Sequence, residues 1–208
     1  MFPVLLDGTT STLKTDDISA ISTLYPGSSF ASTTGRIQGH VLFSDGITPA
    51  QGYNVIARKV GDPRRTAIST VSGYLFTAGT GDIYDPVPAD GTYFYGSSDP
   101  ALIGYYDIAG LPPGEYTLEV EAINNSGTIP FIGDSSVGPL GAYPDGPRFQ
   151  FKMPGTCSLQ YLKYPASPTD SCSDYTKIQV SAGTTVNTNT DIILLGTPPR
   201  YDAWEDGD

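Results

Sequence analysis

Residues able to carry enzyme chemistry are scarce in this chain of 208 residues, which has a single histidine, His40. A catalytic zinc site takes three protein ligands, and the H-E-x-x-H pattern that supplies two of them is missing. The G-x-S-x-G, P-loop and dinucleotide-binding patterns are missing as well. We therefore expect no catalytic residue, no zinc site and no cofactor in this chain.

Charge is also sparse and one-sided. Only 16% of the residues are charged, and 22 acidic against 11 basic residues give a net charge of −11. An acidic chain repels nucleic acids and anionic membrane surfaces, so we expect neither as a partner. No apolar run approaches the ~18 residues of a membrane span. Residues 1–6 are apolar but lack a basic flank, so a signal peptide, if the protein is exported, is expected upstream of this chain.

Cysteine occurs twice, as Cys157 and Cys172 in a polar segment that contains proline. A zinc site would need more ligands than two thiols, and no C-x-x-C pattern is present. In an exported protein we expect the two to form a disulfide, and a loop of that size would stabilise the fold by about 3 kcal/mol. Two unpaired thiols are the alternative.

Turn-forming residues and tyrosine are abundant, with 24 glycines, 18 prolines and 14 tyrosines. Residues 110–120 read G-L-P-P-G-E-Y-T-L-E-V, in which the two prolines exclude a helix or a central strand and Gly114 allows the chain to turn. Apolar residues then alternate with polar ones, which predicts a strand with one buried face and one wet face. The buried set is Tyr116, Leu118 and Val120, and the wet set is Glu115, Thr117, Glu119 and Glu121.

Further strands are predicted at residues 36–43, 53–60, 66–76, 104–109, 149–153, 177–180 and 190–195. In the first, His40 falls on the solvent face, where we expect a surface histidine and not a ligand. Basic residues concentrate around residues 61–63, the turn between the next two strands, namely Arg58, Lys59, Arg64 and Arg65. We interpret it as a solvated hairpin tip, with contact to an anion or a polysaccharide as the alternative.

Two of these patterns resemble the carboxypeptidase regulatory-like domain. They are G-R-I-Q-G-H-V at residues 35–41 and, about 70 residues later, G-L-P-P-G-E-Y at 110–116. The residues 182–185, A-G-T-T, resemble the family's closing turn. The resemblance implies a mainly β fold, a transthyretin-like or Ig-like antiparallel β-sandwich over residues 35–197. It also implies a non-catalytic accessory module, usual in secreted or surface proteins of bacteria.

One short N-terminal α-helix is predicted over residues 13–25. Ile18, Ile21, Leu24 and Tyr25 recur at helical spacing and form an apolar stripe for one buried face. Two acidic residues fall in the first turn, where the helix dipole favours them, and a Pro-Gly pair follows the last residue. Two caps are open: Thr15 is the better N-cap, whereas Lys14 in that slot would place Leu13 and Ile18 as a hydrophobic staple.

This helix, with Met1 and Pro3 before it, resembles the C-terminal end of a matrixin-type (metzincin) zinc metallopeptidase domain. M-F-P at residues 1–3 resembles the methionine turn, and L-x-x-D-D-I-x-x-I-x-x-L-Y at 13–25 the closing helix, although Ala20 and Pro26 stand where that family has glycine. The resemblance implies that Met1 and Pro3 lie beneath the zinc of a parent enzyme. It further implies that Ile18, Ile21, Leu24 and Tyr25 dock the helix onto the catalytic domain.

The two resemblances divide the chain into a metallopeptidase remnant (1–27), a linker (28–34), the β-sandwich (35–197) and an acidic linker to a further domain (198–208). They imply the non-catalytic C-terminal portion of a secreted bacterial zinc metalloendopeptidase, with zinc in the parent and the upstream catalytic domain as partner. The sandwich would stabilise that enzyme or position its protein or polysaccharide substrate.

The alternative is a stand-alone surface or adhesive module that binds glycans or calcium. Residues 77–100, rich in aspartate and tyrosine, would supply calcium ligands or a flat aromatic surface. A decorated loop without such a role is the third interpretation of that segment. The stand-alone module predicts that the apolar stripe of the helix is covered by the sandwich.

Overall fold

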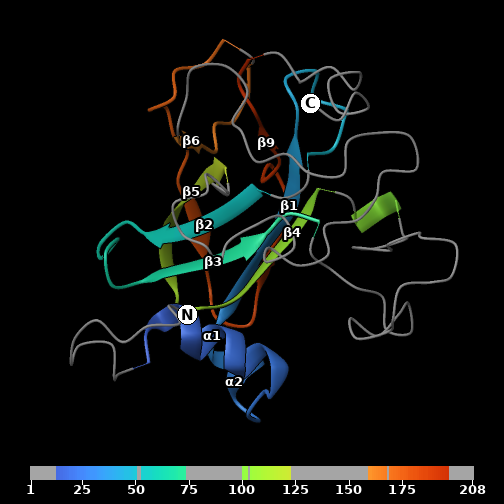
Figure 1. Ribbon diagram of the computed structural model, residues 1–208. Helices are drawn as coiled ribbons and strands as arrows, with labels where there is room; N and C mark the ends of the chain where they lie inside the picture. Colours follow the sequence, from blue (N-terminus) through green and yellow to red (C-terminus); the bar gives the residue numbers. More distant parts are fainter. Residues whose placement is uncertain are drawn as a thin grey trace, which may run out of the picture.

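The computed structural model describes residues 13–50, 53–73, 100–102, 104–122, 159–167 and 169–196. Their strands form two facing sheets, and the two α-helices lie near one end of the strands (Figure 1). The fold is a β-sandwich with few helices, as the sequence predicts. The helices are α1 (Thr15–Leu24), the one-turn α2 (Phe30–Thr33) and the 3-10 turn η2 (Pro100–Leu102).

The first sheet is built around β1, which pairs with β4 on one side and with β8 and β9 on the other. The pairing with β4 is antiparallel, but β8 and β9 run parallel to β1, so the antiparallel prediction is wrong for these two strands. The strands are β1 (Gly35–Leu42), β4 (Tyr105–Leu111), β8 (Thr185–Val186) and β9 (Ile192–Ile193).

The second sheet has the order β3-β2-β5-β6, with β7 also pairing with β5, and all its pairs are antiparallel. Its strands are β2 (Tyr53–Lys59), β3 (Ala67–Val71), β5 (Gly114–Ala122), β6 (Leu159–Tyr161) and β7 (Ile178–Val180). The strands predicted within the described ranges, including the one at 104–109 and the one after Gly114, each correspond to an observed strand, whereas the short β6 and β8 were missed. The strand predicted at 149–153 lies outside the described residues. Residues 28–34, predicted as a linker, contain α2.

The turn at Pro112 and Pro113 carries the chain from one sheet to the other, because β4 lies in the first sheet and β5 in the second. Two side chains bind its carbonyl groups. Lys59 Nζ donates to Pro113 O at 2.8 Å, and Tyr116 Oη donates to Pro112 O at 2.6 Å. The turn is therefore fastened to the β2–β3 hairpin and to the core.

The alternation predicted for β5 places its apolar set correctly, since Tyr116, Leu118 and Val120 are fully buried between the sheets. One polar residue departs from the pattern. Glu119 was expected on the wet face but is only 7% exposed. Its carboxylate accepts from Arg58 Nε at 2.6 Å, and this partner on the neighbouring β2 compensates for the burial of the charge.

Tyrosine contributes three of the largest fully buried side chains, Tyr53, Tyr106 and Tyr116. Burial raises the pKa of all three, that of Tyr116 to about 12, so they stay neutral at physiological pH. The hydroxyl of Tyr106 donates to Thr190 O at 2.6 Å. That bond ties β4 to the segment that enters β9, because a buried hydroxyl needs a partner.

We predict that Leu118→Ala lowers the free energy of unfolding by about 2–5 kcal/mol, because it leaves a cavity at a fully buried position. The same substitution at Leu24, which is 74% exposed on α1, is the matched control and should change it by less than about 0.5 kcal/mol. Urea unfolding of both variants measures the difference. Equal losses would contradict the placement of these two leucines.

Candidate functional site

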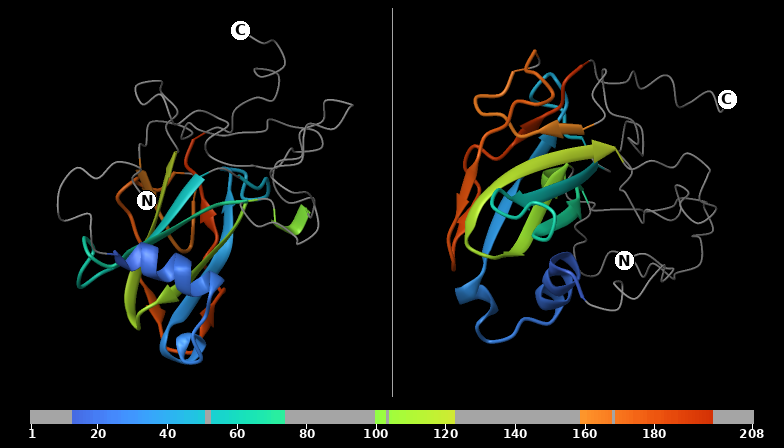
Figure 2. Two further views of the ribbon diagram at one scale, coloured as in Figure 1. Left: turned by 60° about the horizontal axis from the view of Figure 1, so that its bottom comes forward. Right: turned by 90° about the vertical axis from the view of Figure 1, so that its left-hand side faces the viewer.

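Helix α1 lies across the strands near one end of the sandwich, in contact with β3 and β4 (Figure 2). Each of these strands is the outer strand of its sheet among the described residues. An outer strand presents backbone N–H and C=O groups without a neighbouring strand. The helix is therefore placed where backbone groups of both sheets need partners.

The start of α1 settles the choice of cap. Lys14 occupies the N-cap position, and its backbone N–H donates to the Asp17 carboxylate at 3.1 Å. Leu13 and Ile18 therefore stand at the positions of a hydrophobic staple, the alternative in which Thr15 is not the cap. Asp16 and Asp17 lie in the first turn, as predicted.

The inward face of α1 is polar and binds the sandwich through hydrogen bonds. Asp16 Oδ1 accepts from the backbone N–H of Ser69 on β3 at 2.8 Å. Ser19, which is buried, donates to Ala109 O on β4 at 2.6 Å. These contacts were not predicted from the sequence, although small polar side chains recur along this face of the helix and could have indicated a hydrogen-bonded surface.

The approach of α1 to β4 depends on Gly110, which has a φ of +73°. A Cβ at this position would lie 2.6 Å from Ser19 Oγ. Glycine is thus required both for the backbone conformation and for the close contact with the helix.

The outward face of α1 carries the predicted apolar stripe. The exposed fractions are 51% for Ile18, 46% for Ile21, 74% for Leu24 and 80% for Tyr25. Leu13, at 58%, extends the same apolar set at the start of the helix. The expectation that the sandwich covers the stripe is wrong, because the polar face of the helix takes that place. We call Leu13, Ile18, Ile21, Leu24 and Tyr25 the outer face of α1.

Several predicted residues lie outside the described part of the chain: Met1, Pro3, Cys157 and nearly all of the segment 77–100. The zinc-supporting role of the first two and the calcium or glycan role of the segment therefore stay predictions. Cys172 is not a free thiol in the structure. Its pairing with Cys157 stays a prediction because Cys157 is not described.

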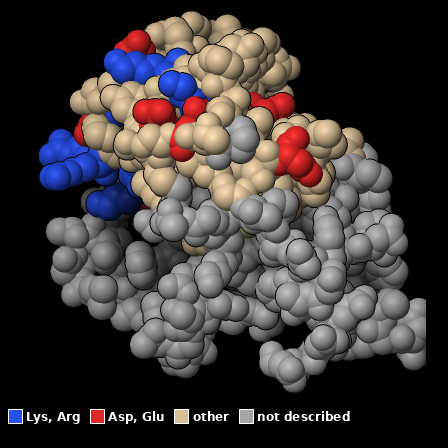
Figure 3. Space-filling model, turned by 90° about the horizontal axis from the view of Figure 1, so that it is seen from above, with Lys and Arg blue, Asp and Glu red and all other residues tan. Residues whose placement is uncertain are grey.

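The basic cluster lies at the β2–β3 hairpin, and basic side chains gather toward that side of the molecule in Figure 3. Arg58 and Lys59 are held by Glu119 and Pro113 O, respectively. Arg64 and Arg65 are exposed, as expected of a solvated tip. Half of the cluster therefore has a structural role that the sequence analysis did not predict.

His40 sits half-exposed on β1, beside Asp191, which directly precedes β9. Asp191 Oδ1 accepts from the backbone N–H of His40 at 2.8 Å and lies 3.7 Å from its ring Nδ1. Nε2 lies 3.2 Å from Ala101 O, and the Tyr105 ring meets the imidazole edge-on at 5.4 Å. A doubly protonated ring can donate to both oxygens, whereas a neutral ring can donate to only one.

The Asp191 carboxylate raises the pKa of His40 above its ordinary 6.5, although partial burial opposes the shift. His40 in turn lowers the pKa of Asp191 below its ordinary 3.8. The pair thus favours its charged form. It fastens η2 and β9 to β1 and is not a ligand set.

Zinc in a parent enzyme stays a prediction. Within the described ranges, no group of three or more His, Cys, Asp or Glu side chains is arranged to hold a metal ion. The one imidazole is engaged by Asp191 and Ala101 O. No helix in the same ranges is long and apolar enough to cross a membrane.

Comparison with protein-family models and with curated proteins found no match. Among solved structures, the chain is similar to BcpA, the major pilin subunit of Bacillus cereus, with 12% identity, a TM-score of 0.35, and coverage of 79% of this chain and 31% of the pilin. GBS52, the minor pilin of Streptococcus agalactiae, shows 13% identity, a TM-score of 0.28, and coverage of 81% and 48%. The chain spans less than half of either pilin. These scores assign no family or role, and the β-sandwich rests on the strand topology described above.

We predict that Asp16→Ala destabilises the contact between α1 and β3 and lowers the free energy of unfolding by about 1–2 kcal/mol. Hydrogen exchange at the Ser69 amide should accelerate, because that N–H loses its acceptor. Asp17→Ala is the matched control, since it removes the same charge from the same helical turn but leaves Ser69 bound. Equal acceleration in both variants would contradict the proposed edge contact.

We predict that the pair of His40 and Asp191 stabilises the fold in mildly acidic solution. A raised His40 pKa gives stability that is complete below 6.5 and is lost as the pH rises through the folded-state pKa. A lowered Asp191 pKa gives stability that is present above 3.8 and is lost as the pH falls through its folded-state pKa. The single imidazole of the chain makes its NMR titration unambiguous.

Asp191→Asn should bring the His40 pKa back toward 6.5. His40→Gln should make the midpoint urea concentration of unfolding less dependent on pH as the pH rises above 6.5. A titration midpoint at or below 6.5 in the unmodified protein would refute this prediction.

Proposed function

We propose that this chain is a non-catalytic β-sandwich module of a secreted or surface protein, and that it docks a neighbouring protein domain on the outer face of α1. The observation that carries the proposal is the orientation of the helix. Its polar side chains face the sandwich, and its large apolar side chains face away. Clustered apolar residues on an otherwise wet surface mark interaction sites.

A helix of ten residues gains little from its own backbone and depends on packing. Here three side chains of the helix, Thr15, Asp16 and Ser19, form hydrogen bonds with backbone groups of the sandwich. The partner of Thr15 is Arg65 O. The apolar stripe supplies none of this attachment, so it is available to a second surface. The helix is thus suited to join two bodies, with one face committed to each.

In its finer form, we propose that the second body is the catalytic domain of a matrixin-type zinc metallopeptidase. The outward orientation favours this candidate, because Ile18, Ile21, Leu24 and Tyr25 are the residues that the resemblance assigns to docking. Zinc would then be bound by residues outside this chain. The sandwich would support the enzyme or position its protein or polysaccharide substrate.

A glycan- or calcium-binding role for residues 77–100 remains a proposal of its own, because that segment lies almost wholly outside the described residues. A shift of the melting temperature on addition of calcium or oligosaccharide would support it. It does not compete with docking on α1, since it uses another part of the chain.

We predict that Ile21→Gln and Leu24→Gln leave the stability of the isolated chain within about 0.5 kcal/mol of the unmodified value, because glutamine is a good helix former and both side chains are exposed. In the longer product of the gene, expressed with whatever is encoded in frame before Met1, the α1 amides should exchange more slowly than in the isolated chain. The two substitutions should remove that extra protection.

Ile47→Gln is the matched control, since Ile47 is 82% exposed and lies away from α1. If the α1 amides of the longer product exchange as fast as those of the isolated chain, the docking proposal is contradicted. An upstream sequence without H-E-x-x-H-x-x-G-x-x-H would reject only the metallopeptidase form of it.

A further inference from the structure

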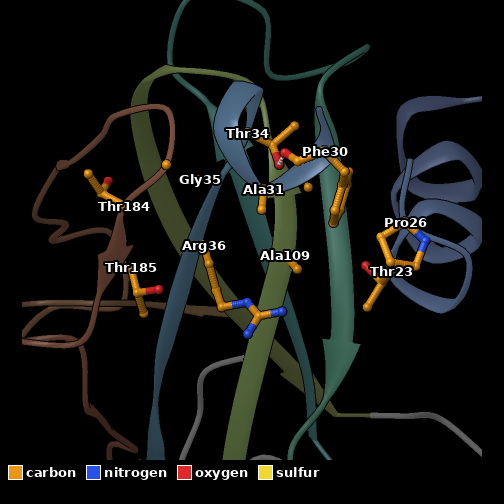
Figure 4. Close-up of a pocket in the computed structure, with 12 residues that line it drawn as sticks. Thr23, Pro26, Phe30, Ala31, Thr34, Gly35, Arg36, Ala109, Thr184 and Thr185 are labelled. Carbon is orange, nitrogen blue, oxygen red and sulfur yellow. Dashed lines mark hydrogen bonds between the residues drawn. The ribbon is translucent and has the colours of Figure 1, made fainter. Parts of the chain in front are cut away.

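A second recognition feature lies beside the helices, where a pocket of about 370 Å³ opens between α1, α2 and the first sheet (Figure 4). Its floor is made of small buried residues, Gly35, Ala109 and Gly110. The ring of Phe30 on α2 forms one wall, and the turn that leads into β8 forms another. The volume lies within the range of small-ligand sites.

Among the described residues that line the pocket, Arg36 alone is charged, and Figure 4 shows its guanidinium extending between Thr185 and Ala109. Its Nε lies 3.2 Å from Asp107 Oδ1 on β4. Asp107 thus pairs with the Nε side as an ion pair, although its buried Oδ1 has no hydrogen bond of good geometry. The two terminal nitrogens of Arg36 form no hydrogen bond to another described residue. The outer edge of the guanidinium can therefore bind a carboxylate through two hydrogen bonds.

Three of the four threonine hydroxyls that line the pocket have their protons committed. Thr23 donates to Ser19 O at 2.8 Å, Thr34 to Phe30 O at 2.7 Å, and Thr184 to Ser181 O at 2.8 Å. A hydroxyl that donates to the backbone still has lone pairs and can accept a hydrogen bond. The pocket thus combines one cationic donor, several acceptors and an apolar wall.

A ligand that complements this set carries an anion, N–H donors and an apolar group. The last residue of a peptide has all three within a short distance: its carboxylate, its amide N–H and its side chain. We propose that the pocket binds the C-terminal residue of a peptide, with the carboxylate on the outer edge of Arg36 and the side chain against Phe30. Partial exposure of Arg36, at 40%, leaves the site open to an incoming chain end.

The proposal is tested by titrating the full chain with a hexapeptide that ends in valine, followed by NMR or calorimetry. The free acid should bind at least about tenfold more tightly than the same peptide with a C-terminal amide, because amidation removes the charge-assisted contact. A uronic-acid disaccharide tests whether any carboxylate suffices. Equal affinity for acid and amide, no binding of the acid, or tighter binding of the disaccharide would overturn the assignment.

Arg36→Gln should weaken binding of the free acid by about tenfold or more, and Arg64→Gln, the same change on the exposed hairpin, should leave it unchanged. Because Arg36→Gln also leaves Asp107 without its cation, Ala31→Phe provides an independent variant. It fills the pocket from α2 while the ion pair stays intact, and it should weaken binding as much. Unchanged affinity in Ala31→Phe would place the peptide elsewhere.

Discussion

Helix α1 satisfies backbone groups at the outer strands of both sheets, and the placement of its outer face and of the Arg36 pocket depends on that contact. Asp16 accepts from the N–H of Ser69 on β3, and Ser19 donates to the carbonyl of Ala109 on β4. Unpaired backbone groups of an outer strand require hydrogen-bonding partners, so the hydrophilic side of the helix faces the sandwich. An amphipathic surface helix ordinarily buries its apolar side instead. The exposed stripe is the direct result of this reversal.

The turn between β4 and β5 is where the helix, the hairpin and the core meet. Gly110, just before it, allows Ser19 to approach, Lys59 binds Pro113 O from the hairpin, and Tyr116 binds Pro112 O from the core. The same helical segment forms one side of the Arg36 pocket. The apolar face and the pocket thus adjoin in one helical segment, because Thr23 and Pro26 line the pocket and flank Leu24 and Tyr25 of the outer face.

Local patterns in the sequence account for much of the fold, because period-two and period-3.6 spacings are properties of neighbouring residues. They predicted β1, β2, β5 and α1 and, in β5, the buried Leu118. Long-range partners account for what they missed. Glu119 is buried because Arg58 lies opposite it on another strand, and β8 is a strand only because β1 lies beside it.

The same division applies to the candidate sites. The stripe residues Ile18 and Leu24 were recognised from their spacing, but the side of the helix that meets the sandwich depends on Ser69 and Ala109, distant in the chain. The sequence pattern indicated only a strand residue at Arg36, because the pocket around it is formed by segments that are distant in the chain.

The pairing of β1 with the last two strands has a consequence for how the molecule is made. Arg36 stands opposite Thr185, and Val41 opposite Ile192, so β1 completes its sheet only after about 150 further residues have left the ribosome. Closing so long a loop is entropically costly, and folds dominated by such distant pairings form slowly. During synthesis one edge of the nascent β1 stays unpaired, and the time that it spends unpaired is set by the length of the chain between it and β8.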